Sequence, residues 1–116
     1  MSCISVIILT YNESLHIERC IKSLLPVVTD IFVVDSFSTD NTVAICQKLG
    51  AKVVQNPWKN YANQFQWGID NCEIKTKWTM RMDADEYLEP GLVEEINEKF
   101  QSLDVDIFTL GMKLKL

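Results

Sequence analysis

Glycine is scarce in this chain of 116 residues, which contains only Gly50, Gly68, Gly91 and Gly111. These four lie too far apart to form the glycine-rich turn of dinucleotide-binding proteins or the phosphate-binding loop of P-loop proteins. No serine stands in a Gly-x-Ser-x-Gly motif either, which excludes the nucleophile turn of α/β-hydrolases. A phosphorylated ligand would therefore have to be held by side chains and a metal ion.

Histidine and closely spaced cysteines are also lacking. His16 is the only histidine, and the four cysteines form no Cys-x-x-Cys pair. Neither a zinc site nor a disulfide framework is therefore expected. Cys20, Cys46 and Cys72 fall on the apolar faces of predicted helices. They are predicted to be buried, reduced thiols, which favours a cytoplasmic location.

Long apolar runs and an excess of positive charge are missing as well. No apolar run approaches the roughly 18 residues of a membrane-spanning helix. The net charge of -5 argues against non-specific binding to nucleic acid, which requires a basic surface, so no nucleic-acid partner is expected. A length of 116 residues suffices for one compact domain, and we predict a single domain over residues 1–116.

Strand and helix patterns alternate along the chain. Strands are predicted over residues 5–9, 31–34, 52–55, 78–82 and 106–110. Apolar residues between them recur with helical spacing and predict helices that begin after Asn12 as N-cap, at Thr39 or Asp40, near Tyr61 and at Pro90. The residues expected on the buried helix faces are Ile17, Cys20, Ile21, Leu24 and Leu25, then Val43, Cys46 and Leu49, then Ala62, Phe65, Ile69 and Cys72, and finally Leu92, Ile96 and Phe100.

This alternation predicts an α/β fold: an open, mainly parallel, Rossmann-like sheet with helices on both faces. Polar residues follow three of the strands, in the segments Thr10-Tyr11-Asn12-Glu13, Asp35-Ser36 and Asp83-Ala84-Asp85-Glu86. The carboxyl ends of parallel strands lie along one edge of a sheet, where ligands bind. We therefore expect these three segments to converge.

The convergent residues suit a nucleotide. Tyr11 offers an aromatic face to a base, and Asp35 or Ser36 offers hydrogen bonds to a base or ribose. Asp83 and Asp85 suit a hard divalent cation that shares its coordination with phosphates. Together these segments predict a nucleotide site.

The same residues also have structural interpretations. Asp83 and Asp85 could cap the turn that follows them, and Tyr11 could be a half-buried structural aromatic. Trp58 and Trp67 fit the hydrophobic core better than a sugar-binding platform. These alternatives remain open at the level of the sequence.

The strand-end motifs resemble the family-2 glycosyltransferases of the GT-A fold. The resemblance rests on residues 5–13 (SVIILTYNE), 33–40 (VVDSFSTD) and 82–86 (MDADE), and it extends in the same order over essentially the whole chain. Residues 35–40 (DSFSTD) and 55–58 (QNPW) are most similar to the bacterial lipopolysaccharide-core branch of that family.

The resemblance implies an inverting transferase that moves a sugar from a nucleotide-diphosphate donor to a glycan or lipid-linked glycan acceptor of the cell envelope, in lipopolysaccharide core synthesis. Tyr11 would contact the base, while Asp83 and Asp85 would bind Mg²⁺ or Mn²⁺ against the diphosphate. The other donor-binding residues that it implies are Thr10, Asn12, Glu13, Asp35, Ser36, Gln64 and Ala84. The enzyme is expected in the cytoplasm, at the inner face of the bacterial inner membrane.

Two positions depart from the family's pattern. Many members carry a second Asp where this chain has Ser36, and that Asp binds uracil, so the base is left open. Many also carry a basic residue on the third helix, where this chain has Phe65-Gln66 and Gln64 is the nearest polar candidate.

Family members continue well past the position of Leu116, and their later half supplies the acceptor site and the general base. We therefore expect this chain to be a truncated donor-binding part whose catalytic base lies beyond Leu116. Its apolar tail would be an exposed strand or surface that promotes self-association, formed by Leu110, Met112, Leu114 and Leu116.

Two other functions remain possible for this pattern. A phosphatase of the haloacid dehalogenase type also uses Asp-x-Asp after a parallel strand, but its first Asp ends the first core strand. Such phosphatases also place Thr or Val two residues past the second Asp, where this chain has Tyr87. The other alternative is a non-catalytic nucleotide-binding or assembly module.

Overall fold

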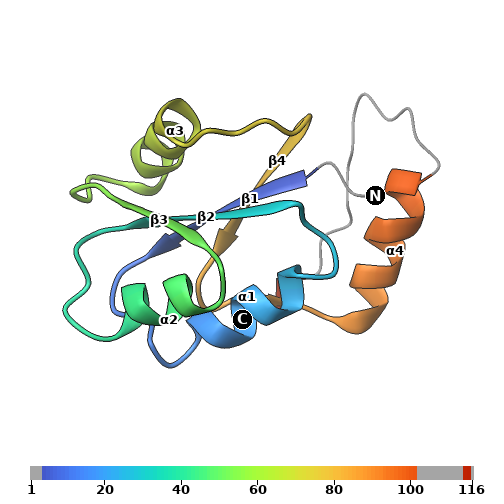
Figure 1. The fold of residues 1–116 in the computed structure, drawn as a ribbon, viewed down its shortest axis with the longest axis horizontal. Helices are drawn as coiled ribbons and strands as arrows, with labels where there is room; N and C mark the ends of the chain where they lie inside the picture. Colours follow the sequence, from blue (N-terminus) through green and yellow to red (C-terminus); the bar gives the residue numbers. More distant parts are fainter. Residues whose placement is uncertain (1–3, 102–113, 116) are drawn as a thin grey trace.

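The structure is a computed structural model that describes residues 4–101, 114 and 115. A four-stranded sheet forms its middle layer, with its strands in the spatial order β3-β2-β1-β4 (Figure 1). The strands are β1 (Ile4–Thr10), β2 (Asp30–Asp35), β3 (Lys52–Gln55) and β4 (Trp78–Asp83). Each neighbouring pair is parallel, as the sequence predicted. All four strands therefore present their carboxyl ends at one edge of the sheet.

Helices cover both faces of this sheet, which confirms the predicted architecture (Figure 1). The helices α1 (Ile17–Leu24) and α2 (Thr42–Lys48) lie on one face, and α3 (Tyr61–Asn71) lies on the other. The fourth helix, α4 (Pro90–Gln101), stands at one end of the molecule and contacts α1. Across the described residues, no helix combines the length and apolarity that a membrane crossing demands.

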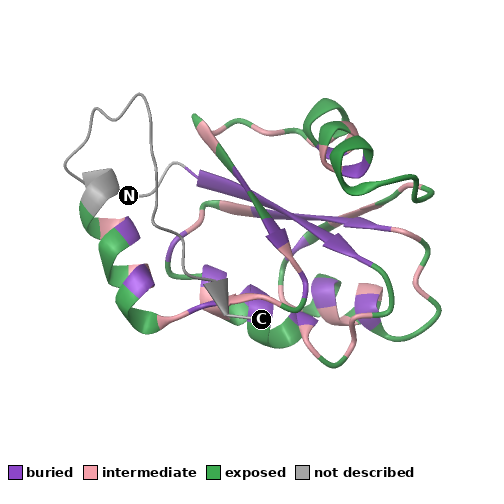
Figure 2. Cartoon of the chain, turned by 180° about the vertical axis from the view of Figure 1, so that it is seen from behind, coloured by how far each residue is buried: buried purple, intermediate pink, exposed green. Residues whose placement is uncertain are grey.

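Residues of the central strands are buried, as expected for a sheet that lies between two layers of helices (Figure 2). Every residue of β1 is buried, because the strand has a neighbour on each side and helices on both faces. In β4, Met80 and Met82 are buried while Thr79 and Arg81 are exposed. The alternation seen in the sequence of this strand is therefore confirmed.

Most of the predicted inward positions on α1, α2 and α4 are confirmed. The buried ones are Ile17, Cys20, Ile21, Leu24, Cys46, Leu92 and Ile96. The prediction for Leu25 is wrong, because this side chain is 52% exposed. Leu25 is the C-cap residue that follows the last residue of α1, where the chain leaves the helix.

The predicted inward face of α3 is rotated relative to the observed one. Its buried residues are Gln64 and Gly68. Of the predicted residues, Phe65 and Cys72 are partly buried and pack against the apolar layer, whereas Ala62 and Ile69 are exposed. The helix packs through Gly68, where an added Cβ would stand 3.0 Å from Val34 Cγ2 and 3.2 Å from Ile7 Cγ2. Because glycine has no side chain, it carries no hydrophobic signal in the sequence, and the face that contains it was overlooked.

A second, two-stranded sheet was not predicted. It pairs β5 (Tyr87–Leu88) with β6 (Leu114–Lys115) in antiparallel fashion. The strand expected over residues 106–110 and the tail residues Leu110, Met112 and Leu116 lie outside the described residues. The self-association that these residues suggested stays a prediction.

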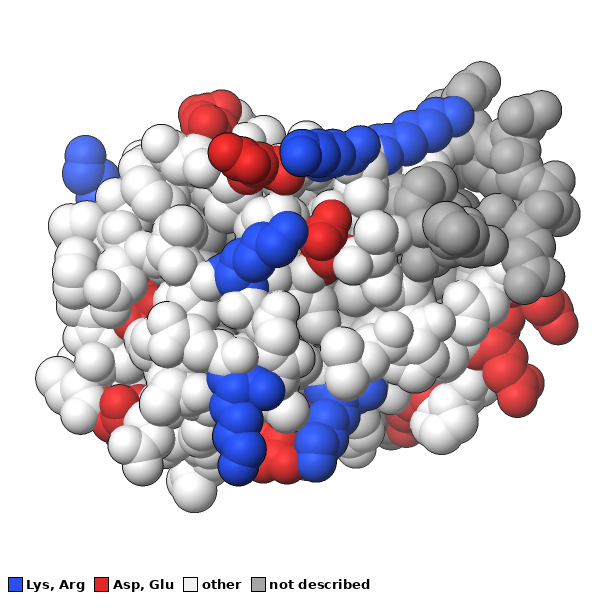
Figure 3. All heavy atoms as spheres, in the orientation of Figure 1, with Lys and Arg blue, Asp and Glu red and all other residues white. Residues whose placement is uncertain are grey.

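Charges of both signs are interspersed over the face drawn in Figure 3. Exposed ion pairs join Lys22 to Glu18 within α1 and Lys52 to Asp30 between the ends of two strands. Pairs of this kind contribute little to stability, because water screens them. The fold therefore depends on its two apolar layers and on the buried polar contacts described below.

We expect Gly68→Ala to destabilise the protein. Overpacking against Ile7 and Val34 costs about 1–3 kcal/mol, which exceeds the helix-propensity gain of about 1 kcal/mol. The free energy of unfolding measured with urea should therefore fall by about 1 kcal/mol. Gly91→Ala is the matched control: it lies at the start of α4 with nothing within 4 Å of its added Cβ, and it should be neutral or stabilising. Equal effects of both changes would contradict the close approach of α3.

Candidate functional site

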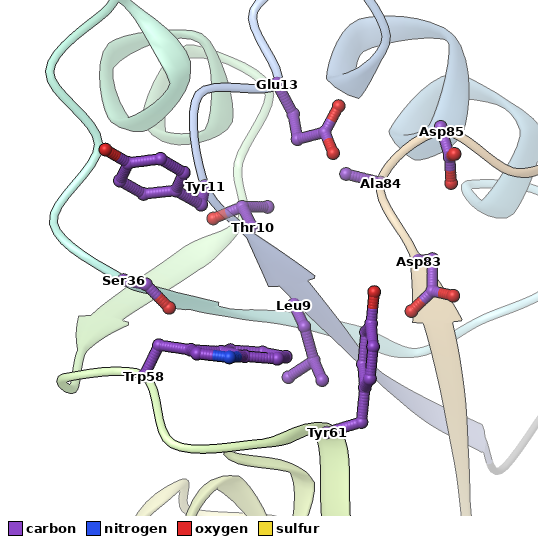
Figure 4. A pocket seen from close by; sticks show the side chains of 10 residues that line it. All are labelled: Leu9, Thr10, Tyr11, Glu13, Ser36, Trp58, Tyr61, Asp83, Ala84 and Asp85. Carbon is purple, nitrogen blue, oxygen red and sulfur yellow. The ribbon is translucent and has the colours of Figure 1, made fainter.

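A cavity of about 420 Å³ opens at the carboxyl edge of the sheet (Figure 4). It is bounded by the segments that follow β1 and β2, by the acidic turn at the end of β4, and by the segment between β3 and α3. The lining residues are Leu9, Thr10, Tyr11, Glu13, Ser36, Trp58, Tyr61, Asp83, Ala84 and Asp85. All three polar segments of the sequence thus reach one cavity, although Asn12, Asp35 and Gln64 are not among its lining residues.

Tyr11 is exposed at the mouth of this cavity. It is 56% exposed and lines the cavity, so a ligand can reach its ring, and the alternative of a half-buried structural aromatic stays open. It follows Thr10, the last residue of β1, whose hydroxyl is turned away to donate a hydrogen bond to Asp35 Oδ1 over 2.7 Å. An aromatic ring is therefore presented to a ligand directly beyond a buried strand.

Asn12 joins two loops and does not cap α1. The N-cap position of α1 is held by His16, and Asn12 has a positive φ of 51°. The Asn12 N–H donates to Ser38 Oγ over 2.8 Å, and its Oδ1 accepts the N–H of Thr39 over 2.7 Å. Asn and Asp tolerate this left-handed conformation better than other side chains, which explains its place in the turn. The contacts hold the residue after Tyr11 in place.

A second contact ties the same loops together. The Glu13 N–H donates to the hydroxyl of Thr42, the first residue of α2, over 2.8 Å. The Asp40 carboxylate accepts the Thr42 N–H over 2.9 Å, although Asn41 holds the N-cap position. Hydrogen bonds from Thr42, chiefly from its side chain, lower the pKa of Asp40 to about 2. The loops after β1 and β2 therefore form one hydrogen-bonded unit.

Asp35 is fully buried beneath the cavity and saturated with hydrogen bonds. Its Oδ1 accepts from the hydroxyls of Thr10 and Ser38. Its Oδ2 accepts from the Ser38 N–H over 2.8 Å and from Gln55 Nε2 over 3.2 Å. Two carboxylate oxygens accept about four hydrogen bonds, so none is left for a ligand in this conformation. The structure gives Asp35 a positioning role, and the predicted contact with the donor stays a prediction.

Gln64 forms a buried polar cluster with Ser36 and Asn56. Its Nε2 donates to Ser36 Oγ and to the Asn56 carbonyl, each over 3.0 Å, and its Oε1 accepts from Asn56 Nδ2 over 2.8 Å. Gln64 is fully buried, whereas Ser36 reaches the cavity. Gln64 therefore acts on a ligand through Ser36, and its predicted direct contact stays a prediction.

The acidic turn carries a buried oxygen that lacks a partner. Asp83 Oδ1 is shielded from solvent and has no hydrogen-bond partner within the described part of the chain. The Asp83 N–H donates to Glu86 Oε1 over 2.8 Å, which holds the turn in shape. Burial of a carboxylate oxygen without a hydrogen bond costs free energy, unless a ligand or an ion pairs with that oxygen. This observation favours a ligand-binding role over the alternative of a simple turn cap.

Two side chains of helix α1 contact this turn and the strand that follows it. Arg19 donates to the Asp85 carbonyl over 3.4 Å and lies 4.2 Å from the centre of the Tyr87 ring. Ser23 Oγ accepts the Leu88 N–H over 3.0 Å. The turn is therefore held by α1 at Asp85 and at Leu88, which follows the acidic residues.

The negative charges of the turn affect their neighbours. Burial, followed by the charges of Asp83 and Asp85, raises the pKa of Glu86. Burial and the nearby carboxylates, that of Glu86 first, also raise the pKa of the Cys20 thiol to about 12. Cys20 and Cys46 are buried free thiols, as predicted, whereas Cys72 is only partly buried.

The donor set fits a hard divalent cation, but it is incomplete by itself. Carboxylate oxygens are suitable ligands for Mg²⁺ or Mn²⁺, which often take further ligands from phosphates and water. Within residues 4–101, 114 and 115, no group of three or more His, Cys, Asp or Glu side chains is arranged to hold a metal. Asp83 and Asp85 could therefore supply part of a coordination shell whose remaining ligands come from a substrate.

Two aromatic residues of the cavity were not predicted as site residues. Trp58 was expected in the core, yet it is 45% exposed and lines the cavity together with Tyr61, which is 57% exposed. Trp67, by contrast, packs against the apolar layer under α3 as expected. The signal available in the sequence was position: Trp58 follows the end of β3, at the same edge as the other site residues.

Comparison with known proteins identifies the family. Residues 5–113 match Glycosyl transferase family 2. The chain belongs to this family. It is 42% identical over 113 residues to an uncharacterised glycosyltransferase of Rickettsia conorii, in an alignment that covers 97% of this chain and 39% of that protein.

A second relative has a more specific name. The family-2 chain is 33% identical over 106 residues to the lipopolysaccharide core biosynthesis glycosyltransferase LpsC of Rhizobium meliloti, covering 87% of this chain and 38% of LpsC. The chain thus spans about two fifths of the length of these curated relatives.

The fold also matches a solved glycosyltransferase structure. Glucosyl-3-phosphoglycerate synthase from Mycobacterium tuberculosis, in complex with Mn²⁺, UDP and glucosyl-3-phosphoglycerate, superposes with a TM-score of 0.67. The sequences are 24% identical, and the match covers 89% of this chain and 41% of that one. At this identity the likeness shows the fold alone, which is of the GT-A type that the sequence resemblance implied.

Glu86→Gln should stabilise the metal-free protein at neutral pH. The raised pKa means that the folded state binds the proton more tightly than the unfolded state, so stability falls as the pH rises through the folded pKa. Gln removes the charge and keeps an oxygen for the Asp83 N–H. Because Glu86 is only partly buried and water screens it, we expect a gain in melting temperature of about 1–3 °C in EDTA at pH 7.

The gain should vanish near pH 3, below the ordinary pKa of glutamate of about 4.3, where the wild-type side chain is itself protonated. Glu73→Gln, at an exposed glutamate outside the turn, is the control and should leave the melting temperature unchanged at both pH values. A gain that persists at pH 3 would attribute the effect to something other than charge.

Proposed function

We propose that this chain is the donor-binding part of an inverting, metal-dependent glycosyltransferase that uses a nucleotide-diphosphate sugar. The observation that carries the proposal is the cavity itself, in which Tyr11, Ser36, Asp83 and Asp85 meet although they come from three different strand ends. The unpartnered Asp83 Oδ1 supports a cation there.

Each residue has a role that its surroundings support. Tyr11 stacks on the base, because its ring is exposed beside the cavity. Ser36 offers a hydroxyl to the base or ribose, with Gln64 holding its oxygen. Asp83 and Asp85 hold Mg²⁺ or Mn²⁺ against the diphosphate. When bound, such an ion neutralises the diphosphate charge and makes the nucleotide diphosphate a better leaving group.

The reaction proposed is attack of an acceptor hydroxyl on the anomeric carbon, in line with the departing diphosphate, so that the configuration inverts. The described residues of this chain supply the donor side of that arrangement. We propose that the general base and the acceptor site belong to the portion of the curated relatives that this chain does not span.

The acceptor proposed is a glycan or lipid-linked glycan of the cell envelope, in lipopolysaccharide core synthesis. The name of the relative LpsC supports this choice. We place the enzyme in the cytoplasm, at the inner face of the inner membrane where such acceptors are assembled. The phosphatase alternative loses its basis, because Asp83 ends β4, the fourth strand along the chain, and because the chain belongs to a glycosyl transferase family.

Mn²⁺ together with a nucleoside diphosphate should raise the melting temperature, and Asp85→Asn should abolish the gain. A ligand that binds only the folded state at one hundred times its Kd stabilises by about 2.7 kcal/mol, which corresponds to several degrees in a domain of this size. The measurement is a thermal melt with UDP, GDP or ADP, each with and without Mn²⁺.

Asp70→Asn, at an exposed aspartate on α3 away from the cavity, is the matched control and should retain the full shift. If none of the three nucleotides shifts the wild-type melt, the donor-binding proposal fails. A non-catalytic assembly module would then be the better description. Release of phosphate from generic phosphoesters would instead revive the phosphatase.

A further inference from the structure

We propose that Arg19 of α1 is a positioning residue of the acidic turn, which comprises residues 83–86. It holds the backbone at Asp85 so that the carboxylates of Asp83 and Asp85 can meet one divalent cation. This inference rests on the proposed function, because it assumes a cation at the turn. It gives a role in the site to a helix that contributes no residue to the lining of the cavity.

The hydrogen bonds within the turn fix its two ends and leave its middle to an outside contact. The Asp83 N–H donates to Glu86 Oε1 over 2.8 Å, and the Glu86 N–H donates to the Asp83 carbonyl over 3.0 Å. Both bonds join the first residue of the turn to the last. Within the described ranges, Asp85 makes one hydrogen bond, in which Arg19 Nη2 donates to its carbonyl over 3.4 Å. The position of Asp85 therefore depends on α1.

A second contact holds Arg19 itself. Its guanidinium lies 4.2 Å from the centre of the Tyr87 ring, within the range of a cation–π interaction. Tyr87 is the first residue of β5 and follows the turn directly. A planar guanidinium can stack on a ring and donate hydrogen bonds from its edge, whereas an ammonium group has no plane to stack. Arg19 thus forms a bridge between the Asp85 backbone and the Tyr87 side chain.

Helix α1 provides a fixed support for this bridge. Its apolar stripe is buried in the same hydrophobic cluster as residues of the sheet. Two neighbours of Arg19 on the helix also contact the chain around the turn: Cys20 Sγ donates to the Asp83 carbonyl over 3.8 Å, and Ser23 Oγ accepts the Leu88 N–H over 3.0 Å. One helix therefore contacts the chain before, at and after Asp85, and Arg19 makes the contact at Asp85.

The charge of Arg19 and its geometry predict opposite effects on metal binding. A positive charge beside the turn repels a cation, so a guanidinium that acted by charge alone would weaken metal binding. Among the ion pairs of the described residues, none joins Arg19 to Asp83, Asp85 or Glu86. The guanidinium contacts a carbonyl and a ring and leaves the oxygens of Asp83 and Asp85 available to a cation. If Arg19 positions the turn, its removal weakens metal binding even though a repulsive charge is lost.

The test measures binding of UDP, GDP and ADP to the 116-residue chain by isothermal titration calorimetry, each with Mn²⁺ and with EDTA. The ratio of the two affinities is the gain from the cation. Where the wild type binds a nucleotide only with Mn²⁺, its whole affinity counts as the gain. A general loss of structure lowers both affinities together, whereas a displaced carboxylate lowers only the affinity with Mn²⁺.

The variants separate the bridge from the charge. Arg19→Gln removes both, and Arg19→Lys keeps the charge. Tyr87→Leu removes the ring that holds the guanidinium, and Tyr87→Phe keeps it. Lys22→Gln is the matched control, because it removes an equal charge from the same helix, where Lys22 is exposed and pairs with Glu18.

We expect Arg19→Gln to reduce the gain from Mn²⁺ about fivefold or more, as the loss of groups that orient metal ligands does. Arg19→Lys and Tyr87→Leu should also reduce the gain. The double variant Arg19→Gln/Tyr87→Leu should lose no more than the larger single loss, since both residues form one bridge. Tyr87→Phe and Lys22→Gln should stay within about twofold of the wild type. The affinity in EDTA should be the same in every variant.

An unchanged gain in Arg19→Gln overturns the inference, and so does an increased gain, which would show that the guanidinium acts by charge. An equal loss in Lys22→Gln overturns it as well, because any cationic side chain on α1 would then suffice. An equal loss with Mn²⁺ and with EDTA contradicts a specific effect on the turn. These results leave the donor site intact.

Melting curves establish that each variant is folded, and Arg19→Lys with Tyr87→Leu carries the test if Arg19→Gln is not. The wild type tests the proposed function separately. If it binds none of the nucleotides, or gains nothing from Mn²⁺, the proposed metal-dependent donor site fails and the role of Arg19 fails with it.

Discussion

The buried carboxylate of Asp35 is the contact on which the arrangement of the site depends. A charge removed from water is tolerated only when its oxygens are fully hydrogen-bonded, and here the donors come from the ends of β1 and β3 and from the loop after β2. Thr10, Gln55 and Ser38 all donate hydrogen bonds to this one carboxylate, so a displacement of any of them would strain the hydrogen bonds of the other two. Tyr11 and Trp58 follow Thr10 and Gln55, so two walls of the cavity take their positions from residues that this one carboxylate holds together.

Negative charge predominates at the other end of the cavity, beside the turn that follows β4. Asp83, Asp85 and Glu86 stand close together on a turn that α1 holds through Arg19 and Ser23. Their repulsion is unfavourable in the metal-free protein, and the unpartnered Asp83 oxygen adds to it. The hydrogen bond from the Asp83 N–H to Glu86 keeps the turn closed nonetheless. An aromatic, hydrogen-bonded end and an anionic end thus face each other across a cavity large enough for a nucleotide.

Much of this was predictable from the sequence, and the physical reason lies in periodicity. The continuous apolar run of β1 and the alternation of β4 indicated buried and half-buried strands, and the helical spacings between strands required parallel crossovers. Parallel strands share an edge, so the polar residues after three of them had to converge. This argument needs no side-chain detail, which is why seven of the ten proposed ligand residues line the cavity.

The remaining residues depended on tertiary contacts that no pattern reports. Asp35 and Gln64 carry the same polar groups whether they meet a ligand or the protein, and only the folded structure shows that Asn56, Gln55 and Thr10 occupy them. Trp58 looked like a core residue because large aromatics usually are. The inward face of α3 was misjudged because the residue that determines it, Gly68, has no side chain to count.

Gly68 also has a consequence for the width of the binding site. The close contact of Gly68 with β1 and β2 determines the distance between α3 and the sheet. Tyr61 is the first residue of this helix. A bulkier residue in that contact would lift the helix and carry the tyrosine and its tryptophan neighbour outward. The aperture of the cavity is thus governed partly by a backbone contact two helical turns away, in a buried layer.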